Sequence, residues 1–104
     1  MGIEVGIWSG DIVDPRGVTF RGEGSDVVAP EMYEDETYPL LSGIDPYGDT
    51  IFNSLQMPRL IKELERRFEA MDAGLKRRTV GRVLGFAREC LDASPHTYLV
   101  FVGD

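Results

Sequence analysis

The chain contains one cysteine and one histidine, Cys90 and His96, and these are the two residues that could form a thiolate–imidazole pair. Such a pair needs its two groups within about 3–4 Å and usually a third group that orients the base. Cys90 falls on the apolar stripe of an expected helix, where a structural and unreactive thiol is typical. His96 follows Pro95 at the start of an expected strand. We therefore predict no catalytic residue in this pair.

Two carboxylates flank the segment Asp45-Pro46-Tyr47-Gly48-Asp49, and a turn there could bring them to one Ca²⁺ or Mg²⁺ ion. The spacing does not match the calcium-loop motif, which needs acids at alternating positions and a distal Glu. The simpler interpretation is a Pro-Gly turn in which Asp49 caps the following helix. We expect no metal ion and no other cofactor.

Acidic residues are concentrated in the first part of the chain. The whole chain has a formal net charge of −7, whereas residues 1–57 hold eleven carboxylates and two arginines and carry −9. No Lys or Arg occurs between Gly22 and Met57. Such a tract repels nucleic-acid phosphates. It attracts a basic protein surface and accelerates encounter with it, so we expect a basic protein as partner and no nucleic acid.

Tyrosines are interspersed with acids in residues 31–49, a stretch without clean periodicity. Tyrosine is enriched at interface hot spots because its large side chain has few rotatable bonds to order. Long irregular segments of compact domains are often functional. The alternative is a solvated acidic loop whose tyrosines pack locally. The residues that we expect to contact a partner are Tyr33, Glu34, Asp35, Glu36, Tyr38, Asp45, Tyr47 and Asp49.

The second expected helix has a basic flank formed by Lys76, Arg77, Arg78, Arg82 and Arg88. Nucleic-acid binding would need a positive face without competing acids nearby. Acidic residues occur in the same helix, so we favour a solvated face that pairs in part with the acidic segment.

The N-terminal residues alternate between apolar and polar or small side chains, which predicts a strand beginning at Ile3. Asp14-Pro15-Arg16-Gly17 fits a type I turn. Residues 3–21 are therefore predicted to form a β-hairpin or short meander, and residues 27–29 could add a short strand.

Helical periodicity is expected from Asp49 or Thr50, either of which could cap a helix, and Pro58 suits a first turn. The first helix should end at Gly74, in the left-handed conformation. The second should run from Leu75 to Leu91 and form an antiparallel pair with the first. Its expected apolar stripe comprises Val80, Val83, Leu84, Ala87, Cys90 and Leu91.

The last apolar run, Thr97–Val102, is rich in β-branched and aromatic residues and predicts a central strand that pairs with the N-terminal hairpin. The predicted fold is a single α+β domain over residues 1–104. In it, a small antiparallel sheet, made of the N-terminal hairpin or meander and the C-terminal strand, packs against the helix pair.

A lone cysteine cannot form an internal disulfide, and this favours a reducing cytoplasm. No apolar run approaches the roughly 18 residues that cross a bilayer, so no membrane association is expected. The N-terminal residues do not have the pattern of a secretory signal.

One stretch of the chain, with its C-terminal residues, resembles small acidic bacterial proteins of unassigned function. The residues concerned are Tyr38-Pro39-Leu40-Leu41, Asp45-Pro46-Tyr47-Gly48-Asp49-Thr50, Phe52-Asn53, Leu55-Gln56 and Phe101-Val102-Gly103-Asp104. This resemblance implies no activity. In size and acidity the chain is also similar to bacterial immunity proteins, which block the active site of a toxin.

The sequence therefore favours a non-enzymatic interaction protein, with an immunity-type inhibitor of a toxin as its most concrete form. The alternative is a small hydrolase or a ligand- or metal-binding domain that uses carboxylates of residues 31–49, because paired acids leave no local signature.

Overall fold

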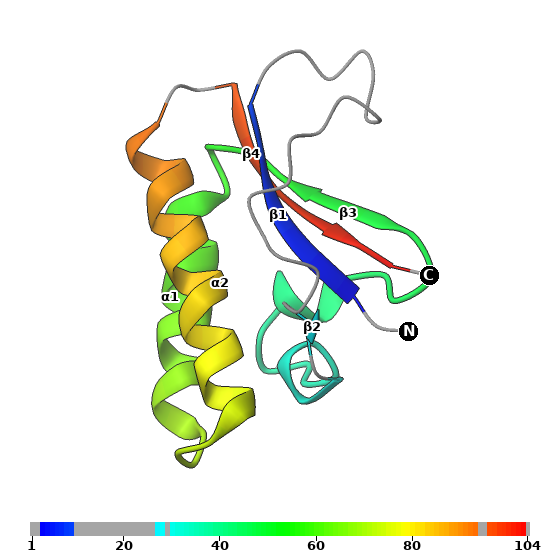
Figure 1. Ribbon diagram of the computed structural model, residues 1–104, viewed down its shortest axis with the longest axis vertical. Coiled ribbons are helices and arrows are strands. Elements are labelled where there is room, and N and C mark those ends of the chain that lie inside the picture. The colour runs from blue at the N-terminus through cyan, green and yellow to red at the C-terminus, as the bar shows by residue number, and fades with distance from the viewer. Residues whose placement is uncertain (1–2, 10–26, 29, 94–95, 104) are drawn as a thin grey trace.

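The computed structural model describes residues 3–9, 27–28, 30–93 and 96–103, which form a sheet and a helix pair in two layers (Figure 1). In chain order the elements are β1 (Ile3–Ser9), β2 (Val27–Val28), the 3-10 turns η2 (Pro30–Met32) and η3 (Leu41–Gly43), β3 (Asp49–Phe52), α1 (Met57–Ala70), α2 (Leu75–Asp92) and β4 (Thr97–Val102). The predicted α+β class is confirmed.

The sheet is antiparallel and has the strand order β2-β1-β4-β3. β4 lies at its centre, where Phe101 is opposite Val5 of β1 on one side and Thr50 of β3 on the other. The prediction of a central C-terminal strand is therefore confirmed, and the short strand predicted at residues 27–29 is confirmed for residues 27 and 28, since residue 29 lies outside the described residues. The turn and return strand of the predicted hairpin lie outside the described residues.

The prediction of helix from Asp49 or Thr50 is wrong, because residues 49–52 form strand β3 and neither residue caps a helix. Thr50, Ile51 and Phe52 have β-branched or aromatic side chains that suit a half-buried strand. Pairing with β4 satisfies backbone groups that a single helical turn would leave open. The helix begins only at Met57, and Pro58 occupies its first turn as expected.

The two helices form the predicted antiparallel pair, but the turn between them differs from expectation. α1 ends at Ala70, and its C-cap Met71 has an extended conformation. Gly74 does have a conformation that favours glycine, with φ 156°, but it is the N-cap of α2 and not the cap of α1. Leu91, predicted in the buried stripe of α2, is exposed.

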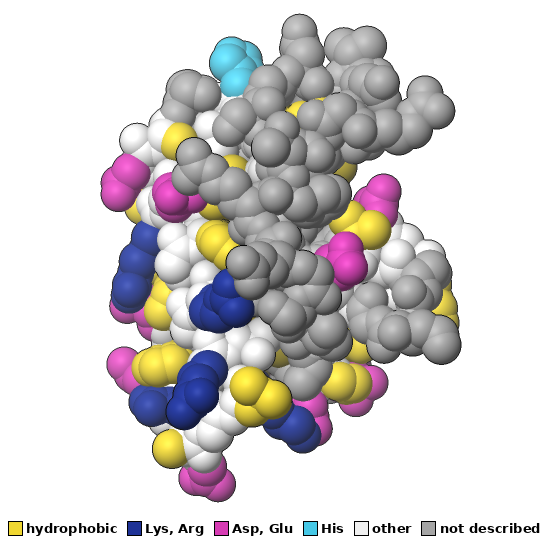
Figure 2. Space-filling model, viewed as in Figure 1, with side chains coloured by type: hydrophobic (Ala, Val, Ile, Leu, Met, Phe, Trp, Pro, Cys, Tyr) yellow, Lys and Arg dark blue, Asp and Glu magenta, His cyan; other side chains and the backbone are white. Residues whose placement is uncertain are grey.

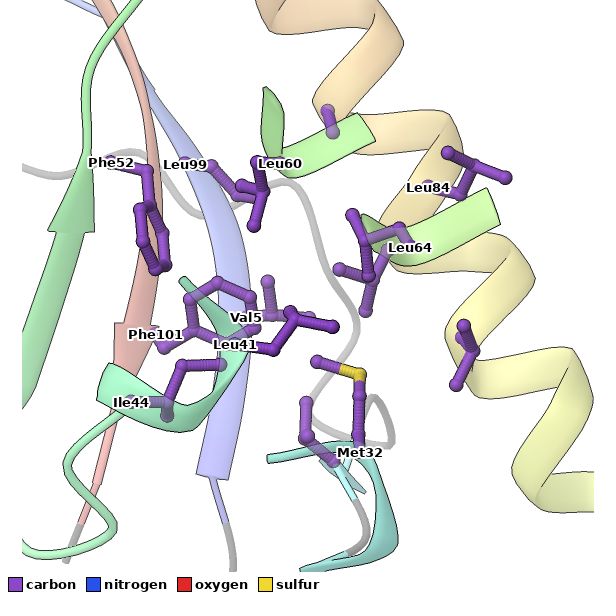
Figure 3. Close-up of a cluster of buried hydrophobic side chains, with 14 of the residues drawn as sticks. Val5, Met32, Leu41, Ile44, Phe52, Leu60, Leu64, Leu84, Leu99 and Phe101 are labelled. Atoms are coloured by element: carbon purple, nitrogen blue, oxygen red, sulfur yellow. The ribbon is translucent and has the colours of Figure 1, made fainter. Parts of the chain in front are cut away.

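The hydrophobic core lies between the sheet and the helices (Figure 3). Val5, Leu99 and Phe101 project from the sheet toward Leu60 and Leu64 of α1, and all five side chains are buried. Each fully buried large apolar side chain contributes about 1.5–3 kcal/mol of transfer free energy. The buried contact between the sheet and the helices therefore fixes the elements from which the connecting loops extend.

Side chains on the other face of the sheet are also buried near its centre. Trp8 and Val100 are almost inaccessible, and the rings of Trp8 and Tyr98 lie 5.7 Å apart. The centre of the sheet is thus covered on both faces. Among the described residues, no helix is both long enough and apolar enough to cross a membrane.

Candidate interaction surface

The acidic segment 31–49 is held on the core by four buried side chains. Met32, Tyr38, Leu41 and Ile44 are buried. In Figure 3, Met32, Leu41 and Ile44 point toward the sheet and α1. The acids that lie between these anchors are consequently displayed on an ordered part of the fold.

A buried carboxylate ties this segment to α1. Glu63 is only 5% exposed, and its Oε1 accepts hydrogen bonds from the backbone N–H groups of Leu40 at 3.0 Å and Leu41 at 3.1 Å. These donors open the 3-10 turn η3, whose first N–H groups have no partner within the turn itself. Glu63 therefore caps a loop from a helix distant in sequence. The sequence prediction missed this residue because no local pattern distinguishes a buried Glu in a helix from an exposed one, and its hydrogen-bond donors are more than 20 residues away in the sequence.

Tyr38 belongs to the interior and not to the surface. Its side chain is 6% exposed, and the guanidinium carbons of Arg66 and Arg67 lie 5.9 and 5.8 Å from the centre of its ring. Such distances are within the range of cation–π attraction. We therefore leave Tyr38 out of the candidate surface, where the sequence had placed it.

The acids of residues 31–36 differ in their partners. Glu31 forms an ion pair with Lys76 of α2 at 2.6 Å, and this hydrogen bond lowers the pKa of its carboxyl group. Hydrogen bonds from the side chain of Thr37 and from its N–H, which lies 2.9 Å from Asp35 Oδ1, lower the pKa of Asp35 as well. Glu34 and Glu36 are exposed, and no Lys or Arg among the described residues forms an ion pair with either. The predicted pairing of the basic helix with the acidic segment thus occurs at Glu31.

Asp45 and Asp49 lie at the turn that leads into β3. Asp45 Oδ1 accepts the N–H of Tyr47 at 2.9 Å, and the N–H of Asp45 donates to Thr50 Oγ1 at 2.9 Å. The side chain of Tyr47 is 82% exposed. Both carboxylates are exposed, and no group of three or more metal-ligating side chains occurs among the residues described.

Burial and the neighbouring side chains both act on Tyr33. Desolvation raises the pKa of Tyr33, and the charges of Glu34, Tyr47 and Glu31 raise it further. These electrostatic effects reach Tyr33 from both the 31–34 turn and the 45–48 turn. Tyr33 itself is half-buried against the core, so Tyr47 is the tyrosine that is fully available to a partner.

The basic side chains of the described residues lie in the other layer of the molecule. Every Lys and Arg that the structure describes lies on α1 or α2. In Figure 2 the visible basic side chains gather over the helix pair and its lower end, and none is seen on the side of β3. The carboxylates of Glu34, Glu36, Asp45 and Asp49 therefore remain uncompensated among the described residues.

The two groups considered for catalysis lie in different environments. Cys90 is buried in the core, and desolvation raises the pKa of its thiol to about 11, whereas His96 is exposed. An open groove of about 590 Å³ at the helix turn is lined in part by Glu31, Arg67 and Lys76. Neither Asp45 nor Asp49 contributes to that groove.

Comparisons with known proteins returned nothing: no protein-family model matches the chain, and no curated protein or solved structure matches it at the significance required.

Proposed function

We propose that this chain is a non-enzymatic interaction protein that binds a basic surface of another protein through the acidic segment 31–49. One observation carries the proposal. Glu34, Glu36, Asp45 and Asp49 are exposed, and no described Lys or Arg forms an ion pair with them. Exposed, unpaired charges of one sign steer a partner of the opposite sign during encounter.

Within this surface the residues have different roles. The carboxylates of Glu34, Asp35 and Glu36 supply long-range attraction and ion pairs at the rim, where individual pairs contribute little net affinity. Tyr47 supplies contact area, because its exposed ring can be desolvated at small entropic cost. Tyr33, which is partly buried against the core, adds the exposed part of its ring to the surface.

An immunity-type inhibitor is the specific form that we propose, with a toxin as the basic partner and the cytoplasm as the place of action. The support is the small, acidic chain and the charge distribution of the described residues, in which the basic side chains lie on the helices and Glu34, Glu36, Asp45 and Asp49 have no ion-pair partner. A partner whose active site is basic would be blocked by such a surface through charge complementarity.

The test is a pull-down from the native host followed by kinetics with the captured partner. The double variant Glu34→Lys/Glu36→Lys should slow association roughly tenfold or more at low ionic strength and flatten its dependence on salt. The control is Glu65→Lys/Asp92→Lys, the same change in charge placed on the helix pair, which should alter association much less.

An unchanged association rate and an unchanged salt dependence in Glu34→Lys/Glu36→Lys would show that the acidic segment does not guide binding. Equal effects of the two double variants would show that net charge alone is responsible.

A further inference from the structure

Three large apolar side chains that the structure leaves exposed lie close together in the sequence, around β3. Tyr47 is 82% exposed, Ile51 37% and Leu55 88%. Tyr47 precedes the strand, Ile51 lies within it and Leu55 is in the turn before α1. Exposed apolar side chains gathered at one place mark an interaction site more often than scattered ones do.

In the part of the chain that the structure describes, β3 is also an edge strand, which hydrogen-bonds to β4 on one side only. In Figure 1 its other side has no neighbouring strand. The ladder shows which backbone groups face outward. The N–H of Gly103 donates to the carbonyl oxygen of Gly48 at 2.8 Å, so these two residues form a hydrogen-bonded pair in the register that continues into β3.

Hydrogen-bonded and non-hydrogen-bonded pairs alternate along an antiparallel ladder. Thr50 and Phe52 are therefore bonded to β4, whereas the N–H and C=O groups of Asp49 and Ile51 point away from it. No hydrogen bond to these outward groups is formed by the described residues. The side chains of Asp49 and Ile51 share the same exposed face of the strand.

The charge of this edge determines what can occupy it. Asp45 and Asp49 are exposed here, and the Lys and Arg side chains of the described residues all lie on the helices. A second copy of the chain would bring its own acidic edge, and it carries the same net charge of −7. Like charges across strands are destabilising, and Lys or Arg opposite Asp49 is favourable.

We propose that the outer edge of β3 receives an extended, basic segment of the partner protein, which adds to the sheet as a further strand. This inference rests on the proposed function and specifies the contact by which the partner is held. In β-strand addition, main-chain hydrogen bonds give affinity and alternate side chains give specificity. The added strand places a Lys or Arg opposite Asp49 and an apolar side chain opposite Ile51.

The probe for this inference is the peptide Ac-Lys-Thr-Val-Thr-Lys-Thr-Val-NH2, which presents Lys and Val alternately on one face. The control peptide has Glu in place of Lys. In ¹⁵N-edited NMR titrations of the whole chain, the basic peptide should shift the amide resonances of Asp49 and Ile51. It should also slow hydrogen exchange of these two amides, which are open to solvent in the free protein.

Ile51→Pro is the sharpest variant, because the N–H that proline lacks is one that β4 does not use. Proline is tolerated on the free side of edge strands, and the preceding Thr50 already has the extended conformation that proline requires. This variant should weaken peptide binding roughly tenfold or more. Ile51→Thr keeps the N–H and the β-branch, and it should weaken binding less than about threefold.

Several results would overturn the inference. Hydrogen exchange at Asp49 and Ile51 is measured in the unmodified chain, so it tests the inference even if Ile51→Pro does not fold. One is peptide binding that leaves exchange at Asp49 and Ile51 unchanged. Another is slow exchange at both amides in a dimer of the chain without peptide. No binding of the basic peptide up to about 5 mM, a concentration suited to weak contacts, also overturns it.

The inference and the proposed function can fail separately. If a captured partner responds to Glu34→Lys/Glu36→Lys but leaves exchange at Asp49 and Ile51 unchanged, the acidic segment guides binding and β3 does not take part. If the partner ignores the charge reversal and still protects these amides, strand addition stands without electrostatic guidance.

Discussion

Glu63 is the residue that most directly fixes the acidic segment against the helices. Its carboxylate is buried and receives backbone N–H groups from Leu40 and Leu41. A buried donor that loses its acceptor costs about 1–3 kcal/mol. Glu63 therefore adds a polar link from α1 to the buried apolar side chains that hold the segment on the core.

We expect Glu63→Ala to lower the free energy of unfolding by roughly 2–4 kcal/mol, since one buried and one part-buried N–H group lose their acceptor. Glu63→Gln keeps one acceptor oxygen and should cost less than the alanine variant. Urea denaturation followed by circular dichroism measures both. The control is Glu65→Ala, whose exposed ion pair with Arg88 should contribute less than about 1 kcal/mol. A loss no greater in Glu63→Ala than in Glu65→Ala would contradict the capping role.

The two helices are in close contact near their connecting turn. Arg77 of α2 places its guanidinium carbon 4.0 Å from the ring centre of Phe68 and donates from Nε to the carbonyl oxygen of Phe68 at 3.1 Å. A Cβ added at Gly81 would lie 3.1 Å from Cε2 of that ring. The small residue at this position therefore lets the helices approach.

Two glycines one turn apart in α2 should respond differently to alanine. A Cβ at Gly85 meets nothing within 4 Å, so Gly85→Ala should stabilise the fold by about 1 kcal/mol through helix propensity alone. Gly81→Ala should gain less or lose stability, because Phe68 is held by Arg77 and cannot move away freely. Thermal unfolding of both variants provides the comparison. Equal stabilisation would mean that the contact between Gly81 and Phe68 is loose.

At the scale of the molecule, the described basic side chains and the unpaired acids of residues 31–49 lie in different places. Acids without ion-pair partners occupy the 31–49 segment and the approach to β3, while the described bases lie on the helices (Figure 2). The basic flank of α2 is interrupted by acids such as Glu89 and Asp92. The chain to which it belongs has a net charge of −7. Attraction to phosphates is therefore weak at any distance beyond the Debye length.

We expect no binding to a 20-base-pair DNA duplex at about 0.15 M salt, because few phosphates could be neutralised and few counterions released. Fluorescence anisotropy with a labelled duplex measures this directly. A dissociation constant below about 10 μM with a steep salt dependence would contradict the division of charge described above. The variant Arg78→Glu/Arg82→Glu would then identify whether α2 is responsible.

The sequence alone determined the features that depend on local pattern. The two helices, the central strand Thr97–Val102 and the acidity of residues 31–49 follow from side-chain periodicity, from turn residues such as Pro58 and from composition. These signals lie within short windows, so no knowledge of distant contacts is needed to read them.

The tertiary structure decided what depends on contacts between distant residues. Residues 49–52 became strand β3 because β4 offers a partner to their backbone, although their apolar spacing also suits a helix. Tyr38 is buried beneath two arginines of α1, and Glu63 is buried to cap η3. Burial, edge position and pairing arise only when the elements assemble, because each is a property of two segments and not of one.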